Sequence, residues 1–186
     1  MTSRALTTAA TREAVVAAAR ALLAEGDWQR FTLDAVAKAA GVTRVTVYNQ
    51  VRSKAGLLDA VLTDVAGRAG MDQLLTDTGD RTGREALAFV VERTCAFWHA
   101  ERAVLRPLFG LAAIDPDVAA NLDRRERWRT DQLDRLLDRL VYVLPRPTVL
   151  AGLAAVTSFP TYAALGPLDP ETAADLVFRL STGLTR

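Results

Sequence analysis

The 186-residue sequence is half hydrophobic, which is enough apolar material for a substantial core. Its formal net charge of +1 says nothing by itself about nucleic acid, and its single cysteine, Cys95, excludes an internal disulfide. One thiol and no run typical of a signal peptide lead us to expect a cytoplasmic location. The uncharged segment 147–168 contains prolines and hydroxyl side chains. We therefore interpret it as a buried interface helix rather than a membrane span.

Apolar residues recur at helical spacing along the chain, and they predict an all-α fold of about nine helices with no convincing strand. Asp115-Pro116 and Asp169-Pro170 are typical helix starts, because proline suits the first helical turn and the aspartate can cap it. Pro160 is expected to kink the helix that contains it. In chain order, we expect a helix at about 11–25, two short helices between Thr32 and Val51, and further helices at about 54–70, 84–100, 103–114, 116–143, 148–165 and 170–184.

The segment from Thr32 to Val51 predicts two short helices joined by a tight turn. Thr32 and Thr43 can cap the two helix starts, since each hydroxyl can accept a hydrogen bond from a free backbone amide. Gly41 can adopt the left-handed conformation that ends the first helix. Val47 and Val51 face inward at a spacing of four residues. This layout is typical of a helix-turn-helix, whose second helix enters the DNA major groove.

Four short motifs make the assignment more specific: Gly41-Val42-Thr43, Thr46-Val47-Tyr48, Ser53-Lys54 and Leu57-Leu58. Together they resemble the signature of the tetracycline-repressor (TetR) family of bacterial transcription regulators. The family implies a homodimer with a helix-turn-helix DNA-binding domain, here residues 1–68, and a helical ligand-binding and dimerisation domain, here residues 69–186. Residues 1–70 carry nine basic against six acidic side chains, whereas the rest carry fourteen against sixteen. The positive excess therefore lies with the motifs.

Side chains around the turn are the candidates for DNA contact. Arg44 is the candidate for direct base reading, because a guanidinium pairs with two acceptors of guanine. Tyr48 and Lys54 match positions at which the family contacts phosphate, and free amides after the two capping threonines can add to these contacts. The full set of DNA-binding candidates is Thr32, Thr43, Arg44, Thr46, Tyr48, Asn49, Gln50 and Lys54.

The C-terminal part supplies candidates for a mainly apolar effector cavity and for a dimer surface. A minority hypothesis adds Arg125 or Arg129 as an anion partner, although the mixed charges from Asp123 to Asp131 are typical of a solvated helix face. The cavity candidates are Phe97, Trp98, Phe109, Phe159 and Tyr162, which the sequence alone cannot distinguish from ordinary core residues. The dimer candidates, on the last two expected helices, are Gly152, Leu153, Val156, Leu176, Val177 and Leu180.

We therefore predict a ligand-responsive repressor that binds a near-palindromic DNA operator as a dimer and is released by a small molecule. We expect no cofactor and no metal, since the sequence shows neither a metal-ligand spacing nor a glycine-rich phosphate loop. Two alternatives remain open: a helical protein-interaction module, and an all-helical enzyme. Tight, salt-sensitive DNA binding would distinguish the predicted regulator from both.

Overall fold

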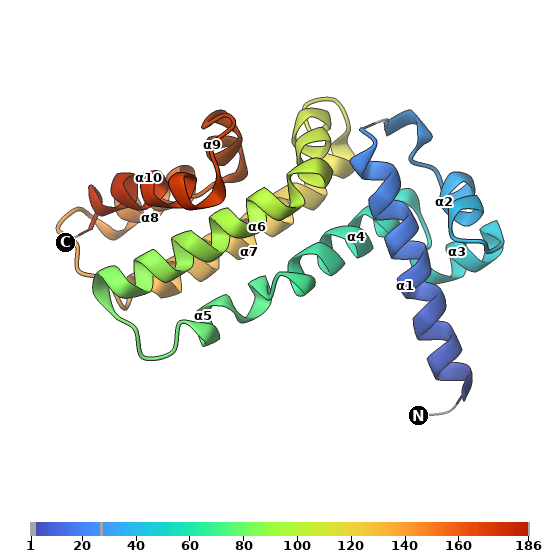
Figure 1. The fold of residues 1–186 in the computed structure, drawn as a ribbon, viewed down its shortest axis with the longest axis horizontal. Coiled ribbons are helices and arrows are strands. Elements are labelled where there is room, and N and C mark those ends of the chain that lie inside the picture. Colours follow the sequence, from blue (N-terminus) through green and yellow to red (C-terminus); the bar gives the residue numbers. More distant parts are fainter. Residues whose placement is uncertain (1–2, 27, 186) are drawn as a thin grey trace. The chain divides into compact units, whose positions relative to one another are not determined.

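The structure of the chain is a computed structural model that describes residues 3–26 and 28–185 (Figure 1). Every regular element in this described part is helical, which confirms the predicted all-α fold. The elements are α1 (Ser3–Ala24), a 3₁₀ turn (Trp28–Arg30), α2 (Leu33–Ala39), α3 (Arg44–Val51), α4 (Lys54–Arg68), a second 3₁₀ turn (Met71–Gln73), α5 (Leu74–Asp77), α6 (Gly83–Leu111), α7 (Pro116–Leu137), α8 (Arg146–Val156), α9 (Phe159–Ala164) and α10 (Pro170–Thr182).

Two compact units divide the chain. The head unit comprises residues 1–68 together with 103–121, and the body unit comprises residues 69–102 and 122–186. The expected DNA-binding domain, residues 1–68, lies in the head unit, and segment 103–121, expected as part of the C-terminal domain, lies in the head unit as well. That segment contains the end of α6, the start of α7 and the corner between them. The head is therefore built from an N-terminal and an internal piece of the chain.

The head core is made by α1 packing against α2, α3 and α4, with α3 also packed on α2 and α4. Its largest fully buried side chains include Phe31, Leu57 and Leu58, joined by Val47 from α3. Burying a side chain of this size contributes about 1.5–3 kcal/mol. These contacts fix the orientation of α3, and they leave its opposite face exposed.

The long helix α6 corrects one prediction, because the expected break between residues 100 and 103 is absent. The helix is continuous for 29 residues, from Gly83 to Leu111, and it contains Pro107. No glycine or proline lies between Ala100 and Ala103, and Glu101 is buried rather than exposed as in a loop. The charged pair Glu101-Arg102 therefore lies inside α6 and does not end the helix.

The segment after Pro145 corrects a second prediction, because Pro160 does not kink one helix but follows the start of another. Helix α8 ends at Val156, and α9 begins at Phe159. The Ser158 hydroxyl accepts a hydrogen bond from the amide of Thr161, so it caps α9 with the proline in the first turn. The count within the described residues becomes ten α-helices, with α5 as a further short addition.

Helix ends differ elsewhere too. Helix α1 begins at Ser3 rather than near Thr11, and α7 ends at Leu137 rather than near Val143. After α7, the amides of Arg139 and Leu140 bond three residues back, which tightens and ends the helix before Pro145. Within the described residues, none of the helices combines the length and the apolar character needed to cross a membrane.

Candidate DNA-binding surface and candidate effector region

The turn between α2 and α3 has the geometry that its sequence predicts. Thr32 accepts a hydrogen bond from the amide of Ala35, and Thr43 accepts one from the amide of Thr46, each at 3.1 Å. Gly41 adopts a φ of 66°, and the amide of Val42 reaches back to the carbonyl of Ala37 at 3.0 Å. This left-handed ending satisfies the last carbonyls of α2 and sets the angle at which α3 leaves.

Helix α3 has one buried and one exposed face. Val47 and Val51 are buried in the head core, whereas Arg44, Tyr48 and Asn49 are exposed. Tyr48 is half exposed, although it is a large aromatic side chain. Burial of Tyr48 and Arg44 would have ruled out a recognition helix, and the structure shows the opposite for both.

Arg44 begins α3 and is held only loosely. Its side chain is 67% exposed, and its Nε lies 3.5 Å from Oδ1 of Asp34, which is equally exposed. A surface pair of this kind contributes about 0–1 kcal/mol and leaves the guanidinium available to another acceptor. Asp34 therefore orients the arginine without consuming its hydrogen-bonding capacity.

The remaining polar candidates differ in how many hydrogen bonds they already make within the protein. The Thr43 hydroxyl caps α3 and also lies 2.9 Å from the Thr46 hydroxyl, so these two side chains form a local pair. Gln50 is half-buried, and its backbone carbonyl accepts a hydrogen bond from Arg12 at 3.0 Å, which ties α1 to α3. Asn49 is exposed.

Val45 is an exposed residue of α3 that the sequence analysis missed as a candidate. Its side chain is 67% exposed, although it is apolar, and it follows Arg44 in the first turn of the helix. Its position two residues before the buried Val47 was the available signal, since residues two apart on a helix face different sides. An apolar side chain at this place can contact the methyl group of thymine.

The turn from α3 into α4 requires a glycine. Arg52 ends α3 with a φ of 65°, and Ser53 then caps α4 by accepting a hydrogen bond from the amide of Gly56 at 3.0 Å. A Cβ atom on Gly56 would lie 2.0 Å from the carbonyl oxygen of Val51. The absent side chain therefore lets the two helices approach backbone to backbone.

Lys54, predicted as a phosphate contact, lies at the start of α4 and folds back onto the head. Its Nζ lies 3.7 Å from the centre of the Trp28 ring and 3.5 Å from the Trp28 carbonyl oxygen, to which it donates. Burial lowers the Lys54 pKa, and the nearby carboxylate of Asp115 partly offsets this. The ammonium is therefore already partnered before any DNA is present.

Four of the five aromatic effector candidates lie in the body unit, and all four are buried. The Trp98 ring centre lies 4.7 Å from that of Phe97 and 5.6 Å from that of Phe159. The Tyr162 hydroxyl lies 3.0 Å from Nδ1 of His99. The fifth candidate, Phe109, belongs to the head unit. The structure thus brings together part of the predicted set, as a packed aromatic cluster.

Thr157, at the break between α8 and α9, holds this cluster to two other helices. Its carbonyl accepts from the Trp98 indole at 2.9 Å, and its hydroxyl accepts from the Arg129 guanidinium at 2.7 Å. Arg129 also donates to the Ala154 carbonyl at 2.7 Å and pairs with Glu126. The guanidinium is therefore an internal brace, which removes Arg129 from the hypothesis of an anion partner for a ligand.

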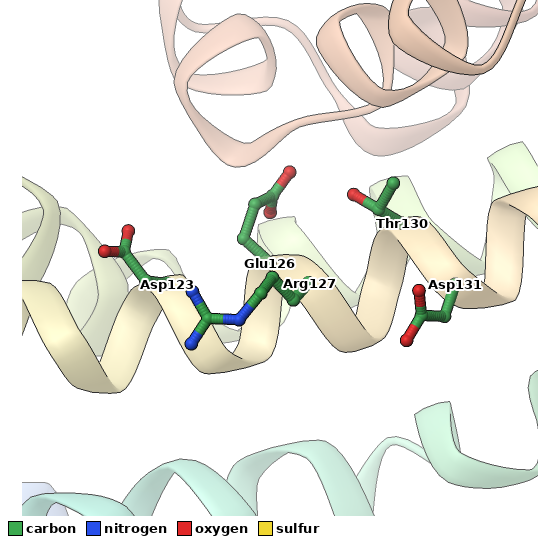
Figure 2. Close-up of a pocket in the computed structure, with 5 residues that line it drawn as sticks. All are labelled: Asp123, Glu126, Arg127, Thr130 and Asp131. Carbon is green, nitrogen blue, oxygen red and sulfur yellow. The ribbon is translucent and has the colours of Figure 1, made fainter. Parts of the chain in front are cut away.

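A groove of about 340 Å³ lies on the face of α7, and Figure 2 shows its five lining side chains. None of the aromatic candidates lines it, and four of its five side chains are exposed, as predicted for the solvated charge run. It contains three carboxylates and one guanidinium, which lies on the same side of the helix as Asp123 in Figure 2. The lining residues are Asp123, Glu126, Arg127, Thr130 and Asp131.

The dimer candidates divide into inward and outward side chains. Helices α8 and α10 pack on each other within the body unit, and Leu153 and Val177 are fully buried there. These two therefore pack inside the subunit and present no surface to a partner. Leu176 and Leu180 are 36% and 48% exposed. Gly152 and Val156 are half-buried, and Gly152 faces the side chain of Leu184.

The N-terminal part of the chain is similar in sequence to known transcription regulators. Residues 15–61 match the family model described as bacterial regulatory proteins, tetR family. A segment of 57 residues is 42% identical to the HTH-type transcriptional regulator AlkX of Mycobacterium tuberculosis. The match spans 31% of this chain and only 27% of that regulator. The family model thus covers the helix-turn-helix, and this chain spans about a quarter of the length of that regulator.

Solved structures resemble nearly the whole chain at low identity. A TetR transcription regulator from Haloarcula marismortui superposes with a TM-score of 0.75 at 15% identity, over 96% of this chain and 100% of the other. NalD of Pseudomonas aeruginosa, the secondary repressor of the MexAB-OprM multidrug efflux pump, gives 0.74 at 21%, over 97% and 98%. SmeT in complex with triclosan gives 0.74 at 20%, over 95% and 92%. At these identities the similarity shows a shared fold.

Proposed function

We propose that this chain, a TetR-family transcription regulator by the sequence of its head and by its fold, is a cytoplasmic repressor controlled by a small molecule. As a homodimer it binds a near-palindromic DNA site, and an effector in the body unit releases it. One observation carries the proposal: α3 has an exposed outward face. Thr43 caps the start of this helix, and its inward face is buried in the head core.

The first turn of α3 reads base edges in the major groove. Arg44 pairs with O6 and N7 of a guanine, and Val45 contacts a thymine methyl group. Both side chains are 67% exposed and lie at the N-terminal end of the helix, the end that enters the groove in helix-turn-helix proteins. Thr46, Asn49 and Gln50 are the further α3 side chains offered to bases or phosphates.

Phosphate contacts surround this reading end. Tyr48 and Lys54 donate from their side chains, and the free amides that follow Thr32 and Thr43 donate from the starts of α2 and α3. These contacts set the position on the duplex without reading sequence. They also make the affinity depend on salt, because each neutralised phosphate releases counterions.

The homodimer forms through α8 and α10, with Leu176 and Leu180 as the exposed apolar side chains at its centre. A two-fold partner places a second α3 one helical turn along the DNA, at about 34 Å. The effector is apolar in part and binds in the body unit next to the aromatic cluster. The complex of SmeT with triclosan supports this, because that protein shares the fold. Release requires the effector to bind more tightly to the DNA-free state.

The decisive experiment selects binding sites from random duplex DNA and then titrates the selected site. Arg44→Ala should weaken binding about 10–100-fold, corresponding to the loss of one bidentate base contact, and should relax preference at one base pair. Arg30→Ala is the matched control, because Arg30 is 65% exposed, lies in the head and is outside α3.

Light scattering of the same samples should give twice the 20.1 kDa chain mass. The proposal fails if the folded wild-type protein shows no salt-sensitive duplex binding, or if both arginine variants bind the selected site as the wild type does. An interaction module or an enzyme would give the first of these results.

A further inference from the structure

Asp115 links three parts of the head unit that are far apart in sequence. It precedes α7 and caps it, with Oδ1 accepting from the amides of Asp117 and Val118 at 3.0 and 3.1 Å. Its other oxygen, Oδ2, accepts from the Trp28 indole at 3.2 Å, across 87 residues of chain. One carboxylate therefore both starts a helix and fixes the edge of an aromatic ring.

The Trp28 ring in turn holds the ammonium of Lys54. The indole stacks on Phe31, with ring centres 5.2 Å apart, and Nζ of Lys54 lies over the indole at 3.7 Å from its centre. Lys54 also donates to the backbone carbonyl of Trp28. The ring is thus fixed at its edge by a carboxylate and covered on a face by a cation.

The start of α4 favours an anion beside Lys54. It is the first residue of α4, where the helix dipole is positive and a cation is unfavourable. Asp115 lies at the edge of the same indole whose face the Lys54 ammonium covers, so among the described residues its negative charge acts on that ammonium. A DNA phosphate arriving at the start of α4 would supply the same kind of charge, so the two anions compete for one ammonium.

We propose that Asp115 is a positioning residue for DNA binding: it acts on Lys54 as an internal substitute for phosphate, and its hydrogen bond from Trp28 weakens that competition. The inference rests on the proposed DNA-binding function. The indole N–H donated to Oδ2 stabilises part of the carboxylate's negative charge, which weakens the attraction of the carboxylate for the ammonium. Asp115 therefore lowers the affinity of the head for DNA, and Trp28 limits the reduction.

Two substitutions should change DNA affinity in opposite directions. Asp115→Asn removes the charge but keeps an oxygen that caps α7, since asparagine is a good N-cap. It should bind a random-sequence duplex of about 30 base pairs about three- to fivefold more tightly. Its affinity should also depend on salt with a slope steeper by up to about one. Trp28→Phe keeps an aromatic ring but frees the carboxylate, so it should bind about two- to threefold more weakly.

Asp117→Asn is the matched control, because it removes the same charge two residues away in the first turn of α7. Removing any one negative charge raises DNA affinity to a similar extent in both asparagine variants. Only an additional increase in the affinity of Asp115→Asn supports the competition with phosphate. In the double variant Asp115→Asn/Trp28→Phe, the loss caused by Trp28→Phe should disappear because the competing carboxylate is absent. A purely structural role predicts weaker binding for every variant that breaks the Trp28–Asp115 hydrogen bond.

A measurement without DNA separates this inference from the proposed function. In ¹⁵N-labelled protein, the indole N–H resonance of Trp28 should move in Asp115→Asn and remain in place in Asp117→Asn. If the wild-type protein binds no duplex, the proposed function fails, whatever the indole shows. If the wild type binds the duplex and Asp115→Asn binds it no more tightly than Asp117→Asn does, then Asp115 does not compete with phosphate for Lys54.

Discussion

The head and the body use the same kinds of side chain in opposite ways. In the head, Arg44 and Tyr48 are exposed on one short helix, and the core beneath them is made of apolar residues. In the body, Arg129 and Tyr162 are buried, and each has a partner inside the subunit. An arginine or a tyrosine thus indicates a binding surface only when the local backbone leaves its end in solvent.

The two units also differ in what fixes their geometry. The segment from α2 to α4 in the head relies on local devices: threonine caps, a left-handed glycine and a backbone contact at Gly56. The body relies on side chains that connect distant helices, chiefly at Thr157. Substitutions that remove one long-range side-chain contact in the body or one local backbone feature in the head should therefore change stability to different extents.

The largest effect is expected from Arg129→Met in the body. This change keeps the volume but removes the donors to Thr157 and Ala154, so it should lower the free energy of unfolding by about 3 kcal/mol. Arg127→Met, on the exposed side of the same helix, should change it by less than about 0.5 kcal/mol. Urea titration measures both values, and hydrogen exchange should show lost protection in α8 and α9. Equal effects of the two variants would contradict the role of Arg129 as a brace.

A smaller effect is expected in the head from two glycines of α4. Gly56→Ala should destabilise the protein by about 2 kcal/mol, because the added Cβ meets the Val51 carbonyl at 2.0 Å. Gly67→Ala should stabilise it by up to about 1 kcal/mol, since nothing lies within 4 Å of the added atom and alanine favours a helix. Thermal unfolding of both variants tests the contrast. Two changes of the same sign would show that the turn relaxes.

The smallest effect concerns Cys95, whose thiol is buried in the body. Burial raises its pKa from an ordinary value of 9.0 to about 11. The folded state therefore keeps the proton that the unfolded chain loses, and the stabilisation is complete below pH 9 and declines as the pH rises towards 11. Between pH 8 and pH 10 this loss is about 1 kcal/mol. Unfolding by urea at both pH values measures it.

Cys95→Ala is the control for this titration, because it removes the thiol and keeps the other groups that titrate in the same range. The variant should lose less stability than the wild type over the interval from pH 8 to pH 10. Identical losses in the two proteins would assign the pH dependence to other groups.

The sequence was most informative where structure depends on neighbours in the chain. The caps at Thr32 and Thr43, the turn at Gly41 and the inward position of Val47 were predicted because each depends on residues within one helical turn. The helix starts at Pro116 and Pro170 were predicted for the same reason. The exposure of Val45 was missed because an apolar residue is assigned to the core by default.

Features that depend on distant contacts were not predictable. The continuity of α6 past Glu101 depends on where that side chain is buried. The separation of α8 from α9 was missed although its cause is local, since Ser158 caps α9 with Pro160 in the first turn. The hydrogen bond of Trp28 with Asp115 joins residues 87 positions apart, and no local pattern indicates it. The roles of Leu153 and Val177 were ambiguous because an apolar residue suits a core and an interface equally well.

The buried state of Cys95 has a practical consequence for following the protein in action. It is the only cysteine of the chain, and its high pKa keeps it as an unreactive thiol at neutral pH. A single cysteine introduced at an exposed head position such as Arg30 would therefore react alone with a spin label or a fluorophore. In a symmetric assembly each copy would carry one such probe, so spectroscopy could measure the distance between the two head units while candidate effectors are added.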